Sequence, residues 1–499
     1  MNGMHKMNDL PILLVGDPSL HEEDCACPDH GALILFDDQP AQWTNDCACP
    51  DTSPAITNDS GARDLLWARV PAAYVAPIAD DFHLAFSPFA PAGPSVLNAS
   101  AAERLRAFNT ARPLSAQPID RNLADQRLIQ PAGKRMGWQQ AAPSTLTAWL
   151  HITNACNLDC PYCYVRKSSA RMSEDTGRKA IDTLFATARQ RGFETVKLKY
   201  AGGEATLHFK LVRTLHEHAR RWSQEAGIGL QEVVLSNGVR LRPDDAAWMQ
   251  EAGVKLAISV DGIDRDHDQQ RPMRNGGGSF SAIERTIDDV LLPMGIKPDI
   301  TITVTRLNAD GIDRAVRWAL ARDLPVSLNF YRANPLSLSR TELQLEEAAI
   351  IRGMEAAYRV FEEVLPARPF LNGLLDRVQA QAHTHTCGVG ISYLVITHEG
   401  KIAQCQMHLD DPVGDVDVAD PLRLTATGPI RNLSVDEKEG CRECSFRYRC
   451  TGGCALETFR ATGRWDISSP HCQIYKRLYP QAMRLEGLRL LKVHGYLVQ

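Results

Sequence analysis

From about residue 145, short apolar runs alternate along the chain with longer segments in which apolar residues recur at helical spacing. Such short runs are typical of buried strands in a parallel sheet, and the longer segments are typical of the helices that cover it. The runs lie at 147–153, 196–201, 232–236, 255–260, 299–305 and 326–332, and the helical segments include 174–190, 207–226, 279–292 and 310–322. This alternation predicts an α/β fold, a partial (β/α)6 barrel of the TIM type, with functional groups at the carboxyl ends of its strands.

The chain before and after this barrel is less regular. Strand-like runs at 73–75 and 83–86 lead to a helix for which Ser100 and Glu103 would form a capping box, so we expect an N-terminal α+β extension. The Pro- and Gln-rich residues 113–143 are typical of a linker or of a segment that wraps the barrel. The expected division is an N-terminal cysteine-containing segment at 1–66, the extension with its linker at 67–143, the barrel at 144–335, a helical connector at 336–384, a cysteine-rich domain at 385–475, and a C-terminal segment at 476–499 that holds a basic amphipathic helix.

Charge and hydropathy exclude two classes of partner. The 499 residues contain 55 Lys and Arg against 60 Asp and Glu, a formal net charge of −5, which argues against a basic nucleic-acid platform. No run approaches the ~18–20 apolar residues that span a bilayer, and the apolar stretch at 10–16 lacks the basic flank and length of a signal peptide. We therefore expect a cytoplasmic protein that binds neither nucleic acid nor membranes. In that compartment the 14 cysteines are expected to bind metal or carry redox chemistry rather than to form disulfides.

The central cysteines follow the first barrel strand in the sequence Cys-Asn-Leu-Asp-Cys-Pro-Tyr-Cys-Tyr, which places thiols at Cys156, Cys160 and Cys163. Three thiolates on one short loop can bind three irons of a 4Fe–4S cluster and leave the fourth iron open to a chelating ligand. A zinc site is the alternative, but it needs a fourth ligand, and His151 on the preceding strand is poorly placed for that role.

This nonapeptide resembles the signature of the radical S-adenosylmethionine (SAM) enzymes. The resemblance implies SAM as cofactor, a central 4Fe–4S cluster and an external electron donor such as flavodoxin or ferredoxin. Gly202, Gly203 and Glu204 are similar to the family's GGE motif, which holds the methionine amino group. The spacing of Ser259 and Arg271 is similar to that of family residues that contact the ribose and the methionine carboxylate. The full set of cofactor contacts implied in this way is Tyr162, Gly202, Gly203, Glu204, Ser236, Ser259, Asp261, Arg271, Leu328 and Asn329.

The C-terminal cysteines resemble the seven-cysteine SPASM extension of radical enzymes that modify peptides and proteins, which implies two auxiliary 4Fe–4S clusters. The family's interleaved pattern assigns Cys441, Cys444, Cys450 and Cys472 to one cluster, and Cys387, Cys405 and Cys454 to the other. The second set has only three thiols, so its cluster would have an open iron or take a ligand from elsewhere. Gln406 stands where the sulfatase-maturing relatives carry an Asp base, and Gln cannot act as a base. We therefore rank sulfatase maturation below peptide crosslinking. His383 and His385 lie beside Cys387, but a His-Thr-His sequence is more often a solvated turn.

The N-terminal third leaves two questions open. The strands and helix of 67–115 suit a peptide-recognition module, to which a leader peptide would add a strand, or equally a structural wrap around the barrel. The hexapeptide Asp-Cys-Ala-Cys-Pro-Asp occurs twice, at 24–29 and 46–51, around a strand-like run at 32–36. Its thiols could bind a further metal, remain as exposed thiols of a tail, or belong to a fused substrate-like segment. These thiols are Cys25, Cys27, Cys47 and Cys49.

Together these patterns predict a maturase that abstracts a hydrogen atom from a residue of a ribosomally made peptide or protein and closes a thioether or C–C crosslink. The sequence names no general base. The alternatives are oxidation of a Cys or Ser side chain, as in the anaerobic sulfatase maturases, and a non-enzymatic iron–sulfur electron carrier. An electron carrier would have no use for the residues at the strand ends that together hold a cofactor.

Overall fold

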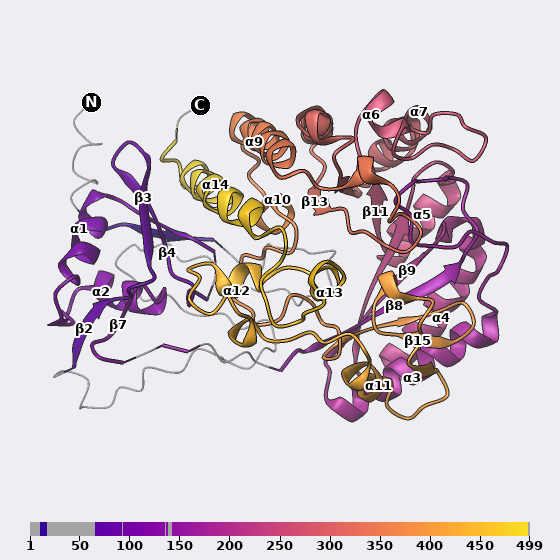
Figure 1. Cartoon of the computed structure of the whole chain (residues 1–499), viewed down its shortest axis with the longest axis horizontal. Helices are drawn as coiled ribbons and strands as arrows, with labels where there is room; N and C mark the ends of the chain where they lie inside the picture. Colours follow the sequence, from indigo (N-terminus) through magenta and orange to yellow (C-terminus); the bar gives the residue numbers. More distant parts are fainter. Residues whose placement is uncertain (1–9, 17–64, 92, 135, 138–141, 498–499) are drawn as a thin grey trace.

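The computed structural model of the chain describes residues 10–16, 65–91, 93–134, 136–137 and 142–497. Both copies of the repeated hexapeptide, with their four cysteines and the strand expected at 32–36, lie outside the described residues. In Figure 1 the N-terminal strands lie on the left, the barrel on the right, and the cysteine-rich C-terminal segment between them. In the described part of the chain, no helix is both long enough and apolar enough to cross a membrane.

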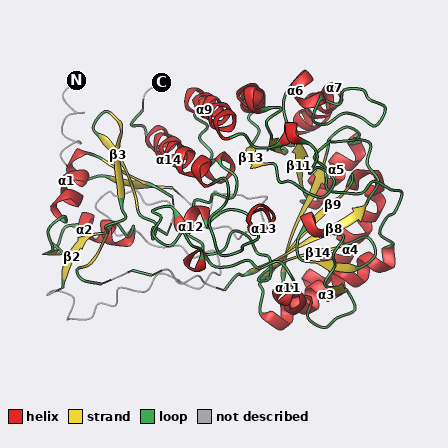
Figure 2. Ribbon diagram, in the orientation of Figure 1, coloured by secondary structure: helices red, strands yellow, loops and turns green. Residues whose placement is uncertain are grey.

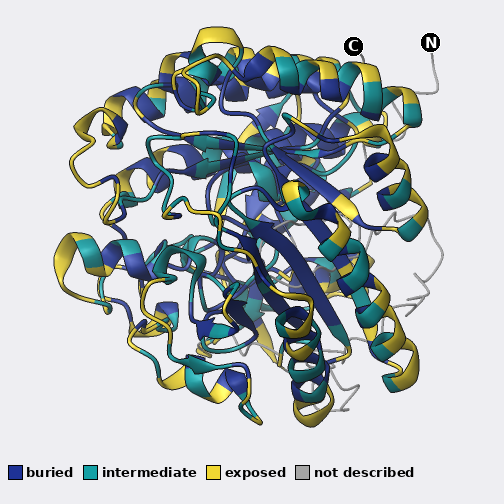
Figure 3. Ribbon diagram, turned by 90° about the vertical axis from the view of Figure 1, so that its right-hand side faces the viewer, coloured by how far each residue is buried: buried dark blue, intermediate teal, exposed yellow. Residues whose placement is uncertain are grey.

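The barrel is built from six parallel strands in the order β13-β12-β11-β10-β9-β8, which confirms the predicted α/β class. The strands are β8 (Thr145–Thr153), β9 (Thr195–Gly202), β10 (Gly229–Ser236), β11 (Lys255–Ser259), β12 (Asp299–Val304) and β13 (Val326–Phe330). Figure 3 shows these strands as buried ribbons inside a layer of helices whose outer faces are exposed. The helices are α3 (Glu174–Arg191), α4 (Phe209–Ala226), α5 (Pro243–Ala252), α6 (Asp264–Asp268), α7 (Phe280–Arg285) and α8 (Ile312–Ala321).

Local sequence signals explain where several of these helices begin and end. The Ser173 hydroxyl accepts the Thr176 N–H at 3.0 Å and caps α3, and Gly192 ends that helix in a left-handed conformation with φ of 75°. Pro243 starts α5, where its missing N–H would have no helical partner. The helix expected at 279–292 is instead α7 followed by a π-helical segment, Thr286–Leu291.

The barrel sheet continues into the C-terminal region. Strand β14 (Tyr393–Ile396) pairs in parallel with β8, and β15 (Lys401–Ala403) and β16 (Gly414–Asp415) follow as antiparallel neighbours. The sheet therefore has nine strands in all among the described residues. These last strands are too short to show a pattern in the sequence, and they attach the cysteine-rich region directly to the strand that precedes the central cysteine loop.

The N-terminal extension contains two small sheets and two helices, visible on the left of Figure 2. Helix α1 (Ala99–Ala107) begins two residues earlier than expected, because the Asn98 side chain accepts the Ala101 N–H at 3.0 Å and caps it. The predicted capping box of Ser100 and Glu103 is therefore wrong. Asn98 also bonds to Leu10 and Ile12, which fixes the helix start to the first strand. The sheets have the orders β1 (Leu13–Val15), β5 (Ser95–Leu97), β4 (Phe82–Phe86), β3 (Tyr74–Ala79), and β6 (Arg112–Pro113), β2 (Leu66–Arg69), β7 (Ile129–Pro131).

The stretch at 113–143 is not only a linker. It contains helix α2 (Pro118–Asp125) and strand β7, and Ile119, Leu123 and Ile129 are buried in the N-terminal core. Asp120, on the same helix, is fully buried and forms an ion pair with Arg104 at 2.5 Å. The Pro and Gln residues around this short helix hid its apolar spacing.

The N-terminal extension and the cysteine-rich region share one hydrophobic core. Trp67 and Leu13 belong to the same buried cluster as Val435, Cys441 and Tyr448. The last helix, α14 (Cys472–Val493), starts earlier than the expected 476 and packs both on α9 (Glu347–Val364) and on the N-terminal strands. The first and last described elements thus enclose the region that carries Cys441.

Candidate active site

The central cysteines lie on the loop after β8, and the backbone of this loop is tightly held. The Thr153 hydroxyl donates to the Ala170 carbonyl at 2.7 Å, and the Met172 N–H bonds to the Ile152 carbonyl at 2.8 Å, so the loop returns alongside its own strand. Burial raises the pKa of Cys160 to about 12, so without a cluster this thiol keeps its proton. A bound iron must displace that proton, as for any thiolate ligand.

Groups on the loop donate to its own sulfur atoms. The Leu158 N–H lies 3.4 Å from Cys156 Sγ, and the Val165 N–H lies 3.5 Å from Cys163 Sγ. The Lys167 ammonium is 3.2 Å from Cys163 Sγ. Such donors stabilise negative charge on sulfur, which suits thiolates that bind iron. The sequence analysis did not single out Lys167; its place four residues after Cys163 was the available signal.

Gly202 and Gly203 let the end of β9 press against the residues that precede Cys156. A Cβ on Gly203 would lie 2.3 Å from the Ala155 carbonyl oxygen, and one on Gly202 would lie 2.4 Å from that of Thr153. In the actual chain the Gly203 N–H donates to the Thr153 carbonyl at 2.6 Å. Both positions therefore require glycine for packing alone, before any cofactor is considered.

Glu204 joins the ends of two neighbouring strands. Its carboxylate is buried and accepts the Ser236 hydroxyl at 2.9 Å, the Asn237 N–H at 2.7 Å, and both the N–H and the hydroxyl of Thr206 at 3.1 and 2.6 Å. Four donors on one carboxylate fix the ends of β9 and β10 relative to each other. Asn237, which the sequence analysis did not select, also donates to Asn157 in the cysteine loop at 2.7 Å.

Asp261 connects the cysteine loop to the end of β11. Its fully buried carboxylate accepts the Tyr162 hydroxyl, the Arg271 Nε at 2.8 Å and the Thr303 N–H at 2.7 Å. Burial opposes the charge of Arg271, yet Asp261 and Tyr162 raise the pKa of the guanidinium, which also lies over the Tyr162 ring at 5.6 Å. The structure thus brings together three of the predicted cofactor contacts, and it makes them partners of one another.

The segment that presents Arg271 is held from behind by His267. The Asp261 N–H donates to His267 Nδ1 at 3.2 Å, so Nε2 carries the proton and donates to the Ser279 hydroxyl at 3.0 Å. That hydroxyl in turn donates to the Arg271 carbonyl at 2.5 Å. Burial lowers the pKa of His267 to about 4, so the ring is neutral at physiological pH.

Strand register separates two residues that the sequence analysis grouped. Ser259 stands opposite Thr301, and Asn329 stands opposite Thr303, all on half-buried positions of β11, β12 and β13. Leu328 stands opposite Ile302 and belongs to the buried core. Because neighbouring strand residues point to opposite faces, the side chain of Leu328 cannot share a site with that of Asn329. The Leu328 side chain therefore lies in the core, and the expected cofactor contact at Leu328 stays a prediction that only its backbone could fulfil.

Four of the C-terminal thiols line a single cavity. Its walls include Cys441, Cys444, Cys450 and Cys472, together with the aromatic rings of Phe446, Tyr475 and Tyr479. A Cβ on Gly452, which has a φ of 79°, would lie 3.1 Å from Cys441 Sγ, so glycine keeps this wall open. Four thiols around an apolar cavity are a donor set that fits a 4Fe–4S cluster.

The other three C-terminal thiols also lie together. Cys387, Cys405 and Cys454 pack against the same small apolar cluster, which includes Tyr393. Burial raises the pKa of Cys405 to about 12, and the nearby Cys454 and Cys387 add to that effect. Gln406 accepts the Tyr393 hydroxyl at 2.7 Å. The three-thiol arrangement fits a cluster with one iron left for another ligand.

Tyr164, the last residue of the central motif, lies between the central loop and the three-thiol set. Its pKa is raised, first by burial and then by Cys163 and Cys405. His383 is buried, hydrogen-bonded to the Gln381 carbonyl at 3.1 Å, and not the solvated turn that we expected. Among the described residues, no three His, Cys, Asp or Glu side chains form a site for a single metal ion.

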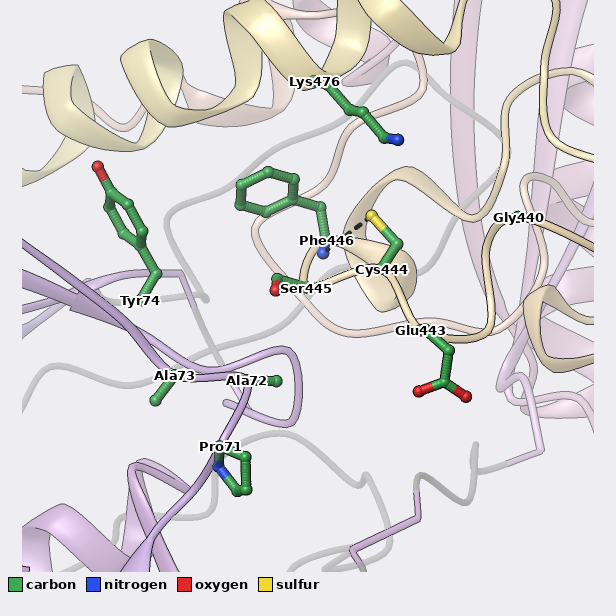
Figure 4. A pocket seen from close by; sticks show the side chains of 10 residues that line it. All are labelled: Pro71, Ala72, Ala73, Tyr74, Gly440, Glu443, Cys444, Ser445, Phe446 and Lys476. Carbon is green, nitrogen blue, oxygen red and sulfur yellow. Dashed lines mark hydrogen bonds between the residues drawn. The ribbon is translucent and has the colours of Figure 1, made fainter. Parts of the chain in front are cut away.

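A surface cavity of about 630 Å³ lies between residues 71–74, which lead into β3, and the four-thiol set. Figure 4 shows Tyr74 on one side and Cys444, Phe446 and Lys476 on the other. The Phe446 N–H donates to Cys444 Sγ at 3.5 Å. This thiol therefore lies close to solvent.

Comparisons with known proteins agree with this arrangement. Residues 150–319 match the model of the Radical SAM superfamily. The chain is 25% identical over 338 residues to the sporulation killing factor maturation protein SkfB of Bacillus subtilis (strain 168), a match that covers 64% of this chain and 76% of SkfB. It is 24% identical over 379 residues to the PqqA peptide cyclase of Bradyrhizobium diazoefficiens, covering 68% and 90% of the two chains.

Another relative is named for the synthesis of heme rather than for the modification of a peptide. The AdoMet-dependent heme synthase of Oleidesulfovibrio alaskensis is 25% identical over 373 residues, covering 68% of this chain and 89% of that protein. Among solved structures, anSMEcpe with bound AdoMet and a Cp18Cys peptide has a TM-score of 0.55 at 18% identity, covering 70% of this chain and 99% of that chain. The fold is therefore shared with anSMEcpe.

Proposed function

We propose that this chain, whose residues 150–319 match the Radical SAM superfamily, is a radical SAM enzyme that modifies a peptide or protein and closes an intramolecular crosslink, either a thioether or a C–C bond. The observation that carries the proposal is the pair of peptide-maturing relatives, SkfB and the PqqA peptide cyclase, which align with about two thirds of the chain. The C-terminal cysteines support it, because seven of them fall into the two groups of thiols described above.

The central loop would hold the radical SAM cluster through Cys156, Cys160 and Cys163. When bound, this cluster and SAM supply a 5′-deoxyadenosyl radical that takes a hydrogen atom from an unactivated carbon. The chain's own residues position the reactants: Gly202 and Gly203 admit the close backbone approach, and Ser259 and Asn329 present polar side chains at the strand ends. Asp261 orients Tyr162 and Arg271 at the rim of the loop.

The two C-terminal sets of thiols would hold auxiliary 4Fe–4S clusters. Cys441, Cys444, Cys450 and Cys472 supply a complete ligand set, and Cys387, Cys405 and Cys454 supply three ligands. With three protein ligands, the second cluster would leave one iron for a substrate sulfur, which would suit thioether formation. An external flavodoxin or ferredoxin would supply electrons. Strand β3 lies at the edge of its sheet, so a leader peptide could pair with it.

Anaerobic reconstitution followed by incubation with SAM, dithionite and a substrate peptide tests the proposed crosslinking activity. We expect 5′-deoxyadenosine, about twelve irons per chain if all three clusters assemble, and, in a substrate peptide, a mass loss of ~2 Da for each crosslink because two hydrogens are removed. The variant C160S should form no 5′-deoxyadenosine. Formation of 5′-deoxyadenosine with production of heme from a heme precursor, and no reaction on any peptide, would favour a function like that of the heme synthase relative.

The same experiment separates the oxidation alternative. A sulfatase-maturase-like enzyme would convert a peptide Cys or Ser to an aldehyde, which reacts with a hydrazide probe, whereas a crosslinked product does not. Gln406 has no basic group and already accepts the Tyr393 hydroxyl. We therefore expect no hydrazide-reactive product.

A further inference from the structure

Lys438 is a buried lysine that is 1% exposed and lies three residues before Cys441. Its ammonium donates to the Thr451 carbonyl at 2.7 Å and lies 3.5 Å from the Thr386 hydroxyl oxygen. Within the described part of the chain, it forms no ion pair with a carboxylate. Burying an ammonium group without an anion is costly, so the fold must supply negative charge to Lys438 by some other means.

The groups that surround this ammonium belong to the segments that carry the C-terminal thiols. Thr386 directly precedes Cys387, and Thr451 directly follows Cys450. The Thr386 hydroxyl also donates to the carbonyl of Gly453, the residue before Cys454, at 2.7 Å. The hydrogen-bonded group of Lys438, Thr386 and Thr451 therefore lies between the two sets of thiols.

Burial lowers the pKa of the Lys438 ammonium, and four thiols, two from each set, oppose that shift. Cys441 and Cys450 belong to the four-thiol set, and Cys387 and Cys454 belong to the three-thiol set. In addition, the Cys441 N–H bonds to the Lys438 carbonyl at 3.2 Å. A lysine placed in this way can interact with a cluster on either side.

The backbone between Cys450 and Cys454 is shaped around this lysine. Thr451, Gly452 and Gly453 all have left-handed φ angles, of 49°, 79° and 73°. Such a conformation costs free energy at Thr451, which is not a glycine, so the surrounding structure must enforce it. A Cβ on Gly452 would lie 2.9 Å from Lys438 Cδ, so the glycine leaves room for the lysine chain.

We propose that Lys438 is a shared counter-charge for both auxiliary clusters and raises the reduction potential of each. The inference rests on the cluster assignments of the proposed function. Each cluster takes up one electron from a reductant such as dithionite and becomes more negative by one charge, while Lys438 keeps its proton. A nearby positive charge in a poorly solvated site stabilises the reduced form more than the oxidised form. Lys438 is thus a positioning residue that would act on electron transfer through the clusters.

The test is a redox titration of the reconstituted enzyme, followed by EPR, in the variants K438M and K438Q. K438Q keeps a donor for the Thr451 carbonyl without the charge, and K438R keeps the charge. We expect K438M and K438Q to disfavour reduction of both auxiliary clusters by at least about tenfold, which is a fall of about 59 mV for a one-electron couple. K438R should stay near the wild-type potentials, and the potential of the central cluster should not move.

Lys476 provides a matched control. It is exposed and acts on Cys441 and Cys472 of the four-thiol set. K476M should therefore shift one potential only, and by less than threefold, because water screens its charge.

Three results would overturn the inference. The first is K438Q with full iron content and less than a twofold change at either cluster. The second is a shift at one cluster alone. The third is loss of both auxiliary clusters from K438M and K438Q with the central cluster retained, which would make Lys438 purely structural. Absence of both auxiliary signals from the wild-type enzyme is a distinct result, because it would refute the cluster assignments themselves.

Discussion

The buried carboxylate of Asp261 makes a sharp prediction, because D261N removes its charge while keeping its shape. Arg271, whose side chain is 11% exposed, would lose its ion-pair partner at 2.8 Å. Breaking a buried pair from one side costs about 3–5 kcal/mol, since the remaining charge stays buried without compensation. The Thr303 N–H would keep an oxygen acceptor in the variant, so the loss comes from Arg271 and Tyr162.

The effect should appear in two measurements on the anaerobically reconstituted enzyme. The midpoint of urea unfolding, followed by far-UV circular dichroism, should fall by the equivalent of at least about 3 kcal/mol. The yield of 5′-deoxyadenosine should fall as well, because Tyr162 lies between Cys160 and Cys163 and loses its hydrogen bond to the Asp261 carboxylate. D264N is the matched control: Asp264 is exposed at the start of α6, three residues after Asp261, and its variant should change stability by less than about 0.5 kcal/mol.

A double-mutant cycle isolates the pair. R271M removes the charge that D261N leaves uncompensated, so D261N/R271M should be less destabilised than the sum of the single variants by about 2 kcal/mol or more. Additive losses, or a D261N variant as stable as D264N, would refute the claim that this carboxylate holds the site together.

Three further predictions concern the loop, the histidines and the shared core. G203A should lower the amount of iron bound at the central cluster, because its Cβ would lie 2.3 Å from the Ala155 carbonyl oxygen. The EPR signal of the reduced enzyme measures this loss. The control G137A, with no atom within 4 Å of the new Cβ, should have no effect. Burial lowers the pKa of His267 to about 4 from an ordinary 6.5, so its contribution to stability is present above pH 6.5 and is lost as the pH falls towards 4; the urea midpoint of H267N should fall less steeply between pH 7.5 and 5.5 than that of the wild type, and equal slopes would contradict the assignment. Deletion of residues 1–115 should remove the cluster of the four-thiol set, seen as a loss of about four irons, because Cys441 shares its core with Trp67 and Leu13; full iron content in the truncated chain would show that the two regions fold independently.

The sequence was most informative where a pattern repeats. The six barrel strands and the main helices lie within a few residues of their expected positions, because each buries an apolar run of sufficient length. The short strands β14, β15 and β16 and the helix α2 were missed, since a run of two to eight residues carries too little periodicity. Their place is set by the surfaces they cover rather than by local preference.

For the site, spacing predicted which thiols would lie together but not how their neighbours would be used. The approach of Gly203 to Ala155, the four bonds to Glu204 and the alternation that turns Leu328 into the core all depend on register between strands. Lys438 was missed for a similar reason. A single lysine near a cysteine has no distinctive pattern, and its burial comes from Thr386 and Thr451, which are distant from each other in the sequence.

The enclosure of Cys441 between the first strand and the last helix bears on the order of biogenesis. Strand β1 is among the first described elements to leave the ribosome, whereas α14, which carries Cys472 and packs on β1, is among the last. The central loop and its barrel are complete by about residue 330 and could receive iron on a nascent chain. The four-thiol set cannot assemble until α14 has been synthesised, because that helix supplies Cys472. A product truncated before α14 would therefore keep the central cysteine loop but lack a complete four-thiol set. Because β1 and α14 enclose Cys441, insertion of a cluster into this set would follow insertion at the central loop, and its presence would report that β1 and α14 have come together.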